Sequence, residues 1–212
     1  MGGAEFLKQS EIFAFLAALF LIAIVLPDSE SGREQGARED PPIIRMSEEK
    51  ASFRFELGSA EVSPQYRQAI ETIIVPQLEV SLRECGNCDA IEVVGHTDGV
   101  HVSKRYSQLD EKVAVSFASG KVEGVLPGSN IDLGMLRALA ILKILRESRD
   151  EGRLKGVTYF FPYSAGQMIL LDESLAKDDV GKDERERRRI EIRLLRSSQR
   201  KVEEAGGGRP AR

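Results

Sequence analysis

The stretch Ile91–Gly99, I-E-V-V-G-H-T-D-G, is a short strand pattern that runs directly into three residues with chemically useful side chains. Strand-like alternation ends at Gly95, and His96, Thr97 and Asp98 follow it. An Asp after a strand is commonly a turn residue, because its side chain hydrogen-bonds the backbone two residues further on. The alternatives are a metal ligand shared with His96, a catalytic acid, or part of a binding pocket.

Around this stretch the hydrophobic periodicity alternates between strand and helix patterns. Ser63 followed by Pro64 predicts a helix start, with Ser as the cap and Pro at a position whose N–H needs no partner. Pro76 is expected to kink this helix. The order β-α-β-α-β-β predicts an α/β sandwich in which helices pack on a mixed sheet. The expected strands are 53–57, 90–95, 157–163 and 189–195, and the expected helices run from 63 through 82 and from about 132 to 149.

The composition limits the functional classes. The chain has 212 residues, of which 42% are hydrophobic and 30% charged, which suits one globular domain with appendages. The net charge of −4 gives no general case for nucleic-acid binding. With only two His and two Cys, a multi-ligand zinc or iron–sulfur site is not expected.

A membrane span is expected near the N-terminus. Ile12 to Pro27 contain no charged residue, and with Glu11 the segment 11–27 approaches the roughly 20 residues that a membrane helix requires. A secretory signal peptide is the alternative, but no small-x-small cleavage site follows. Lys8 precedes the segment and acidic residues dominate after it. This asymmetry predicts a single-pass protein with residues 1–10 in the cytoplasm and the rest outside; for a bacterial chain these are the inner membrane and the periplasm.

The remaining chain divides by composition. Residues 28–51 are polar and highly charged and are expected to be a periplasmic linker, and residues 197–212 are expected to be a disordered tail. The folded domain is therefore predicted to span 52–196. Residues 99–129 are too long for an ordinary connection and are interpreted as an insertion, in which 112–117 alternates like an additional short strand.

Cys85 and Cys88 lie in the sequence C-G-N-C. In an oxidising compartment such as the periplasm they could form a disulfide. The alternatives are a redox motif or half of a metal site. Both are less expected, because the chain has a single C-x-x-C and no second half to complete either site.

Four motifs follow one another along the predicted frame. They are G-H-T-D at 95–98, S-N-I-D-L-G-M-L-R-A at 129–138, Y-S-A-G-Q at 163–167 and R-R-R-I-E-I at 187–192. In this order they resemble the OmpA-like peptidoglycan-binding domain over residues 52–196. The resemblance implies a β-α-β-α-β-β OmpA-like sandwich whose ligand is the peptide stem of the bacterial cell wall.

The resemblance also assigns roles to single residues. Asp98 and Arg137 correspond to the pair that holds the two charged groups of diaminopimelate. A carboxylate suits the ammonium of that ligand, and a guanidinium fork suits its carboxylate. The positions that match supporting residues of the pocket are Asn130, Thr97, Leu133 and Arg188.

Two positions depart from the family pattern. Gly134 stands where the family has Ser, and Arg187 stands where it has Asn. Either change could weaken or retune the pocket.

A membrane span followed by such a domain resembles the MotB family of peptidoglycan-anchored flagellar stator subunits, and ZorB, its relative in anti-phage defence. In these families an acidic residue near the cytoplasmic start of the span carries a proton or sodium ion, and Glu11 corresponds to it. The resemblance implies a homodimer bound to a multi-span partner of the MotA or ZorA type, with no cofactor besides the translocated ion. The short linker 28–51 lacks an amphipathic plug, which favours a compact, ZorB-like stator.

The alternative function is a passive envelope anchor, which would tether the inner membrane to peptidoglycan without ion transport. A hydrolase built on His96 and Asp98 is not expected, because residues so close in a tight turn make a poor acid–base pair and no nucleophile accompanies them. The chain is therefore expected to be neither an enzyme nor a metalloprotein.

Overall fold

The computed structural model describes residues 41–102, 107, 109, 125–177 and 181–198. These ranges belong to a compact unit that begins at Asp40. The expected span 11–27 with Glu11, the expected strand 112–117 and most of the predicted tail lie outside them. No helix in the described ranges has the length and apolar character needed to cross a bilayer.

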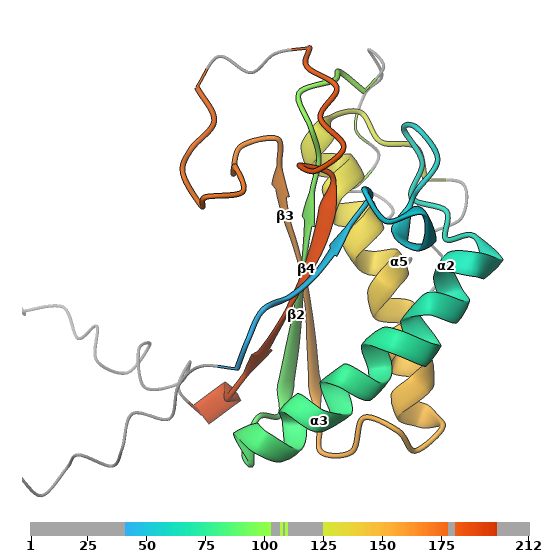
Figure 1. Cartoon of the computed structure of the whole chain (residues 1–212), viewed down its shortest axis with the longest axis vertical. Coiled ribbons are helices and arrows are strands. Elements are labelled where there is room, and N and C mark those ends of the chain that lie inside the picture. Colours follow the sequence, from blue (N-terminus) through green and yellow to red (C-terminus); the bar gives the residue numbers. More distant parts are fainter. Residues whose placement is uncertain (1–40, 103–106, 108, 110–124, 178–180, 199–212) are drawn as a thin grey trace, which may run out of the picture. The chain divides into compact units, whose positions relative to one another are not determined.

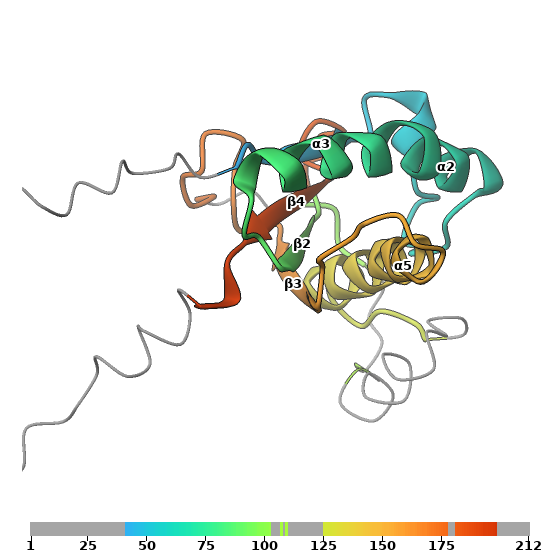
Figure 2. The same cartoon turned by 90° about the horizontal axis from the view of Figure 1, so that it is seen from below.

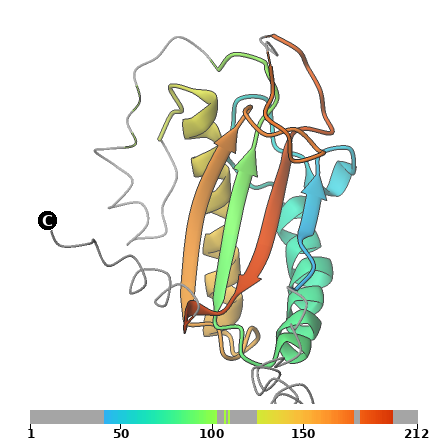
Figure 3. The ribbon, with the colours of Figure 1, turned by 90° about the vertical axis from the view of Figure 1, so that its left-hand side faces the viewer.

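Four strands form one mixed sheet in the order β1-β4-β2-β3. The strands are β1 (Ile44–Ser47), β2 (Ala90–His96), β3 (Tyr159–Gly166) and β4 (Arg189–Leu195). β2 runs parallel to β3, whereas β4 is antiparallel to both β2 and β1. Figure 3 shows the four strands side by side with the helices behind them.

Two long helical segments cover one face of this sheet (Figures 1 and 2). The first contains α2 (Pro64–Ala69), a π-helical turn at Ile70–Ile74 and α3 (Val75–Cys85), and the second is α5 (Asn130–Asp150). Alternate strand residues point toward the helices and form the core, because successive side chains of a strand face opposite sides. The buried residues of this sheet face include Met46, Ile91, Val93, Phe160, Ile190, Ile192 and Leu194. The expected α/β domain, with helices on a mixed sheet, is confirmed.

The first helix begins as the sequence predicts. Ser63 caps it by accepting a hydrogen bond from the Tyr66 N–H at 3.1 Å. The interruption expected at Pro76 takes the form of a π-helical turn directly before it, in which the Val75 N–H bonds the Ile70 carbonyl five residues back. The wider turn accommodates a residue that has no N–H and whose ring crowds the carbonyl four residues earlier.

The prediction of a strand at 53–57 is wrong. Residues 51–53 form a 3₁₀ turn, and the edge strand is instead Ile44–Ser47, which the sequence assigned to the linker. Phe53 and Phe55 alternate with polar residues because both rings are buried in the core, and not because the segment pairs with a strand. Both rings pack edge-on against Tyr66, with centroid distances of 5.7 and 4.9 Å.

Cys85 and Cys88 are joined by a disulfide, with their Cα atoms 5.7 Å apart. It lies in the connection between α3 and β2 and encloses the left-handed Gly86 that ends the helix. Both cysteines are buried against the core.

Helix α5 lies against β2 at a contact between two glycines. A Cβ on Gly95 would be 2.0 Å from the Gly134 carbonyl oxygen, and a Cβ on Gly134 would be 2.3 Å from the Ser164 Oγ and 2.7 Å from the Gly95 oxygen. No side chain larger than hydrogen fits either position without movement of the helix or the sheet. The Gly95 of the opening motif is therefore a packing residue.

Gly134→Ala should destabilise the domain although alanine favours a helix by about 1 kcal/mol over glycine. Overpacking against β2 and Ser164 should produce a net loss of about 2 kcal/mol in the free energy of unfolding, measured by urea denaturation. Gly152→Ala is the control, because its Cβ meets nothing within 4 Å and only its positive φ of 86° opposes the change. A gain in stability for Gly134→Ala would contradict the close contact.

Candidate functional site

The turn after β2 is fixed by hydrogen bonds from three directions. The Thr97 N–H bonds the Gly166 carbonyl of β3 at 2.8 Å. The Asp98 Oδ1 accepts the Val100 N–H at 3.3 Å, as in an Asx turn. Asn130 Nδ2 donates to the carbonyls of Asp98 at 3.3 Å and Val100 at 3.0 Å, which attaches the turn to the start of α5.

The first turns of α5 present their site residues on one face. Ser129 caps the helix by accepting a hydrogen bond from the Asp132 N–H at 3.1 Å. Asn130, Leu133 and Arg137 follow at positions three and four apart, the spacing that stacks side chains along one side of a helix. This face lies against the turn of Thr97 and Asp98.

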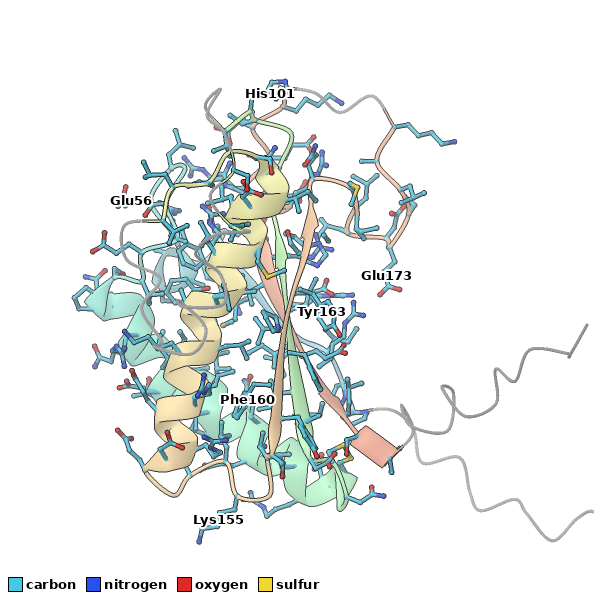
Figure 4. The ribbon with its side chains drawn as sticks, turned by 180° about the vertical axis from the view of Figure 1, so that it is seen from behind. Glu56, His101, Lys155, Phe160, Tyr163 and Glu173 are labelled. Atoms are coloured by element: carbon cyan, nitrogen blue, oxygen red, sulfur yellow. A yellow bond between two sulfur atoms is a disulfide. The ribbon has the colours of Figure 1, made fainter. Side chains whose placement is uncertain are left out.

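A cavity of about 330 Å³ lies between these two segments. It is lined by all six residues that the family resemblance assigns to the pocket: Thr97, Asp98, Asn130, Leu133, Arg137 and Arg188. The rest of its described wall is mainly apolar and comes from Leu57, Gly58, Val100, His101, Val102, Leu126 and Pro127. Figure 4 labels His101 at this end of the domain. A small cavity with an apolar wall and a few charged groups has the character of a ligand site.

Arg137 is buried, with 2% of its surface exposed, and its guanidinium has several internal partners. Nε donates to the Ser59 carbonyl at 3.0 Å and Nη2 to the Glu56 carbonyl at 3.5 Å. Its Nη1 lies 3.2 Å from the Glu48 Oε1, and the guanidinium carbon lies 4.7 Å from the centre of the Phe55 ring. Burial lowers the pKa of Arg137, an effect that the nearby Glu48 opposes.

Asp98 pairs with Arg188 rather than with Arg137. Its Oδ2 accepts hydrogen bonds from the Arg188 Nη1 and from the Glu184 N–H, the latter at 3.4 Å. The same guanidinium donates from Nε to the Glu48 Oε2 at 2.7 Å and from Nη1 to the exposed Asp183. Although burial alone lowers the pKa of Arg188, these three carboxylates raise it.

A continuous ionic network therefore runs Arg137–Glu48–Arg188–Asp98. All four side chains are at most 10% exposed, which makes their mutual pairing necessary for burial. The two residues expected to hold opposite ends of a ligand are linked by this network and already have internal partners of opposite charge.

No protein-family model matches the chain, and no curated protein resembles it recognisably in sequence.

The two departures from the family pattern lie outside the cavity wall. Gly134 faces β2 at the glycine contact rather than the cavity. Arg187 Nη1 binds the Glu184 Oε2 at 2.9 Å, and its Nη2 donates to the Gln167 carbonyl at 2.7 Å. Arg187 thus stabilises the segment that leads into β4, and neither substitution removes a group from the described cavity wall.

The sequence reasoning missed Glu48, the carboxylate that forms ion pairs with both arginines. Glu48 directly follows β1, and its N–H bonds the Arg188 carbonyl at 3.0 Å. Because the composition of residues 28–51 predicts a linker, no local signal assigns Glu48 to the domain. The available clue was the short apolar run before it, I-I-R-M at 43–46.

His96 does not join Asp98 in a shared centre. Its ring is buried beside Glu191, with its Nε2 3.6 Å from the Glu191 Oε2, and it does not line the cavity. The described ranges contain no group of three or more His, Cys, Asp or Glu side chains placed to hold a metal ion.

Glu191 is the centre of a second, separate ion cluster in β4. Its carboxylate accepts hydrogen bonds from Arg189 Nε and Arg193 Nη2, both at 2.8 Å, and from Arg45 Nε at 3.3 Å. Burial alone raises the pKa of this carboxyl. His96, Arg193 and Arg189 outweigh that effect and hold the pKa well below its ordinary value of 4.5.

The stability contributed by Glu191 should be lost in acid. Because its folded-state pKa lies below the unfolded-state value, its contribution is complete above the unfolded pKa and declines as the pH falls toward the folded pKa. Glu191→Gln should reduce the free energy of unfolding by about 3 kcal/mol at neutral pH, since it leaves the buried Arg189 guanidinium without its carboxylate partner. This difference from the wild type should shrink as the pH falls below about 4.5, when measured by urea denaturation.

The control is Glu173→Gln, which removes only an exposed ion pair with Arg45 and should change stability by less than about 1 kcal/mol. A Glu191→Gln difference that stays constant down to pH 2 would contradict the depressed pKa.

Proposed function

We propose that this chain is a non-enzymatic subunit that binds the peptide stem of peptidoglycan through the cavity between β2 and α5. The observation that supports it is the convergence of all six residues assigned by the family resemblance on one cavity wall. These residues come from three separate motifs, at 97–98, 130–137 and 188. Such convergence is expected of a binding site and is not required of six residues chosen for the fold alone.

The charges of the cavity fit the free end of diaminopimelate, which carries an ammonium and a carboxylate. In the proposal Asp98 receives the ammonium and Arg137 the carboxylate. Three of the nitrogen atoms of Arg137 already face internal partners, but each terminal nitrogen carries two N–H groups. In the proposal the ligand carboxylate takes the second N–H of each terminal nitrogen, which is the number that a bidentate contact uses.

The Asp98–Arg188 pair is an internal substitute for the ligand in this mechanism. A zwitterionic ligand can separate the pair and satisfy both groups, because its ammonium replaces Arg188 on Asp98 and its carboxylate approaches the arginines. The exchange keeps every buried charge paired, which matters because an unpaired buried charge is costly. Asn130 and Thr97 hold the turn in place, and Leu133 provides apolar contact for the aliphatic part of the ligand.

Asp98→Ala and Arg137→Ala should each abolish co-sedimentation of the protein with purified peptidoglycan. Truncating one member of a buried charge pair costs about 2–5 kcal/mol, a loss of affinity of roughly thirtyfold or more. Asp150→Ala is the matched control for an acidic residue, and Arg149→Ala for a basic one. Both lie at the far end of α5, where they pair with each other. Unchanged sedimentation of both site variants would refute the proposed wall binding.

The membrane part of the proposal rests on the sequence of residues 11–27 and on its resemblance to stator subunits. In this proposal the chain crosses the bacterial inner membrane once, forms a homodimer, and associates with a multi-span partner of the MotA or ZorA type. Glu11 carries a proton or sodium ion while the periplasmic domain holds the cell wall. Anchoring matters mechanically, because a motor can exert torque only if one part of it stays fixed.

Glu11→Gln should eliminate ion flux through the complex with its multi-span partner in reconstituted vesicles. The variant keeps the size of the side chain but removes its ability to bind and release a cation. Assembly with the partner and peptidoglycan sedimentation should be unchanged. Glu11→Asp is the control and should retain flux. Full flux in the Gln variant would exclude Glu11 as the ion carrier, and absence of flux in the wild-type complex would favour the passive anchor.

A further inference from the structure

Glu48 is the charged group of the ionic network that does not itself line the cavity. It lies behind the two arginines that do, with its Oε1 3.2 Å from the Arg137 Nη1 and its Oε2 2.7 Å from the Arg188 Nε. Its own backbone N–H bonds the Arg188 carbonyl at 3.0 Å, so the carboxylate is held from the end of β1. Its side chain is 5% exposed. Glu48 therefore accepts a hydrogen bond from Arg188 and forms an ion pair with Arg137 at the same time.

The network is balanced in charge because of Glu48. Arg137 and Arg188 contribute two positive charges, and Glu48 and Asp98 contribute two negative ones. Asp183 also contacts Arg188, but 68% of its side chain is exposed, so solvent and salt screen its charge. Without Glu48 the buried network would carry one net positive charge.

We propose that Glu48 is a specificity-determining residue that makes the cavity select ligand ends bearing both an ammonium and a carboxylate over ends bearing a carboxylate alone. This inference rests on the proposed peptidoglycan-stem binding. A zwitterionic end adds no net charge to a balanced network and can replace the Asp98–Arg188 pair completely. A purely anionic end leaves Asp98 without a cation and adds an uncompensated negative charge in a buried setting.

The position of Glu48 also explains how the arginines stay in place during the exchange. When a ligand ammonium takes over Asp98, Arg188 loses one anionic partner but keeps its Nε bond to Glu48. Arg137 keeps its contacts with Glu48 and with the Ser59 carbonyl. Glu48 is thus a positioning residue as well as a counter-charge, and it need not touch the ligand.

The test compares two ligands of the same carbon skeleton by calorimetry on the full chain. One is meso-diaminopimelate, and the other is pimelate, which lacks both amino groups. The wild type should bind diaminopimelate at least about tenfold more tightly than pimelate. Glu48→Gln should reduce this ratio by about tenfold, because the pimelate carboxylate then restores the charge balance. Glu48→Asp keeps the charge and should keep most of the preference.

The affinity ratio separates specificity from a merely structural role, because loss of folded protein weakens both ligands equally. A Glu48→Gln variant that folds and keeps the wild-type ratio would overturn the inference while leaving the proposed function intact. A wild type that binds neither diaminopimelate nor peptidoglycan would refute the proposed function itself.

If Glu48→Gln does not fold, Arg188→Gln tests the same charge balance with the opposite sign, because it removes a positive charge from the network instead of a negative one. It should shift preference away from pimelate and toward the diamine cadaverine, and unchanged selectivity there would also overturn the inference.

Discussion

The contact between the backbones of Gly95 and Gly134 sets the geometry on which the cavity depends. It lets α5 approach β2 far more closely than side chains would permit. The turn of Thr97 and Asp98 begins two residues after Gly95, and Arg137 lies one helical turn after Gly134. The glycine contact therefore determines how far the carboxylate on the sheet side lies from the guanidinium on the helix side.

Much of this fold follows from local patterns. The cap at Ser63, the strand at 90–95 and the strand at 189–195 were predictable because each combines a clear period with a clear boundary residue. The edge strand was not predictable in the same way. Phe53 and Phe55 imitate a strand because both are buried against Tyr66, whereas Ile44–Ser47 is short and surrounded by charge. Such an edge strand is stabilised mainly by its neighbour β4, an interaction that local sequence does not encode.

The residues of the candidate site also differ in how far the local sequence predicts them. The motifs identified Asp98, Asn130 and Arg137 because each occupies a fixed place relative to a strand end or a helix start. They did not reveal that Asp98 pairs with Arg188 or that Glu48 joins both arginines. Those pairings depend on which chain segments meet in three dimensions, and Glu48 lies 140 positions from Arg188. Ordered motifs thus locate the wall of a cavity, while the partners behind that wall require the structure.

The disulfide between Cys85 and Cys88 links the covalent structure of the domain to the redox environment in which it folds. It closes the start of β2, whereas the cavity lies at the opposite end of that strand. Because such a bridge persists in an oxidising environment, the covalent chemistry of Cys85 and Cys88 reports the redox conditions under which the domain folds. A domain retained in a reducing cytoplasm would keep two buried thiols at this position. The oxidation state of these two cysteines, which lie far from the cavity, thus serves as a built-in marker of whether the domain folded in an oxidising or a reducing compartment.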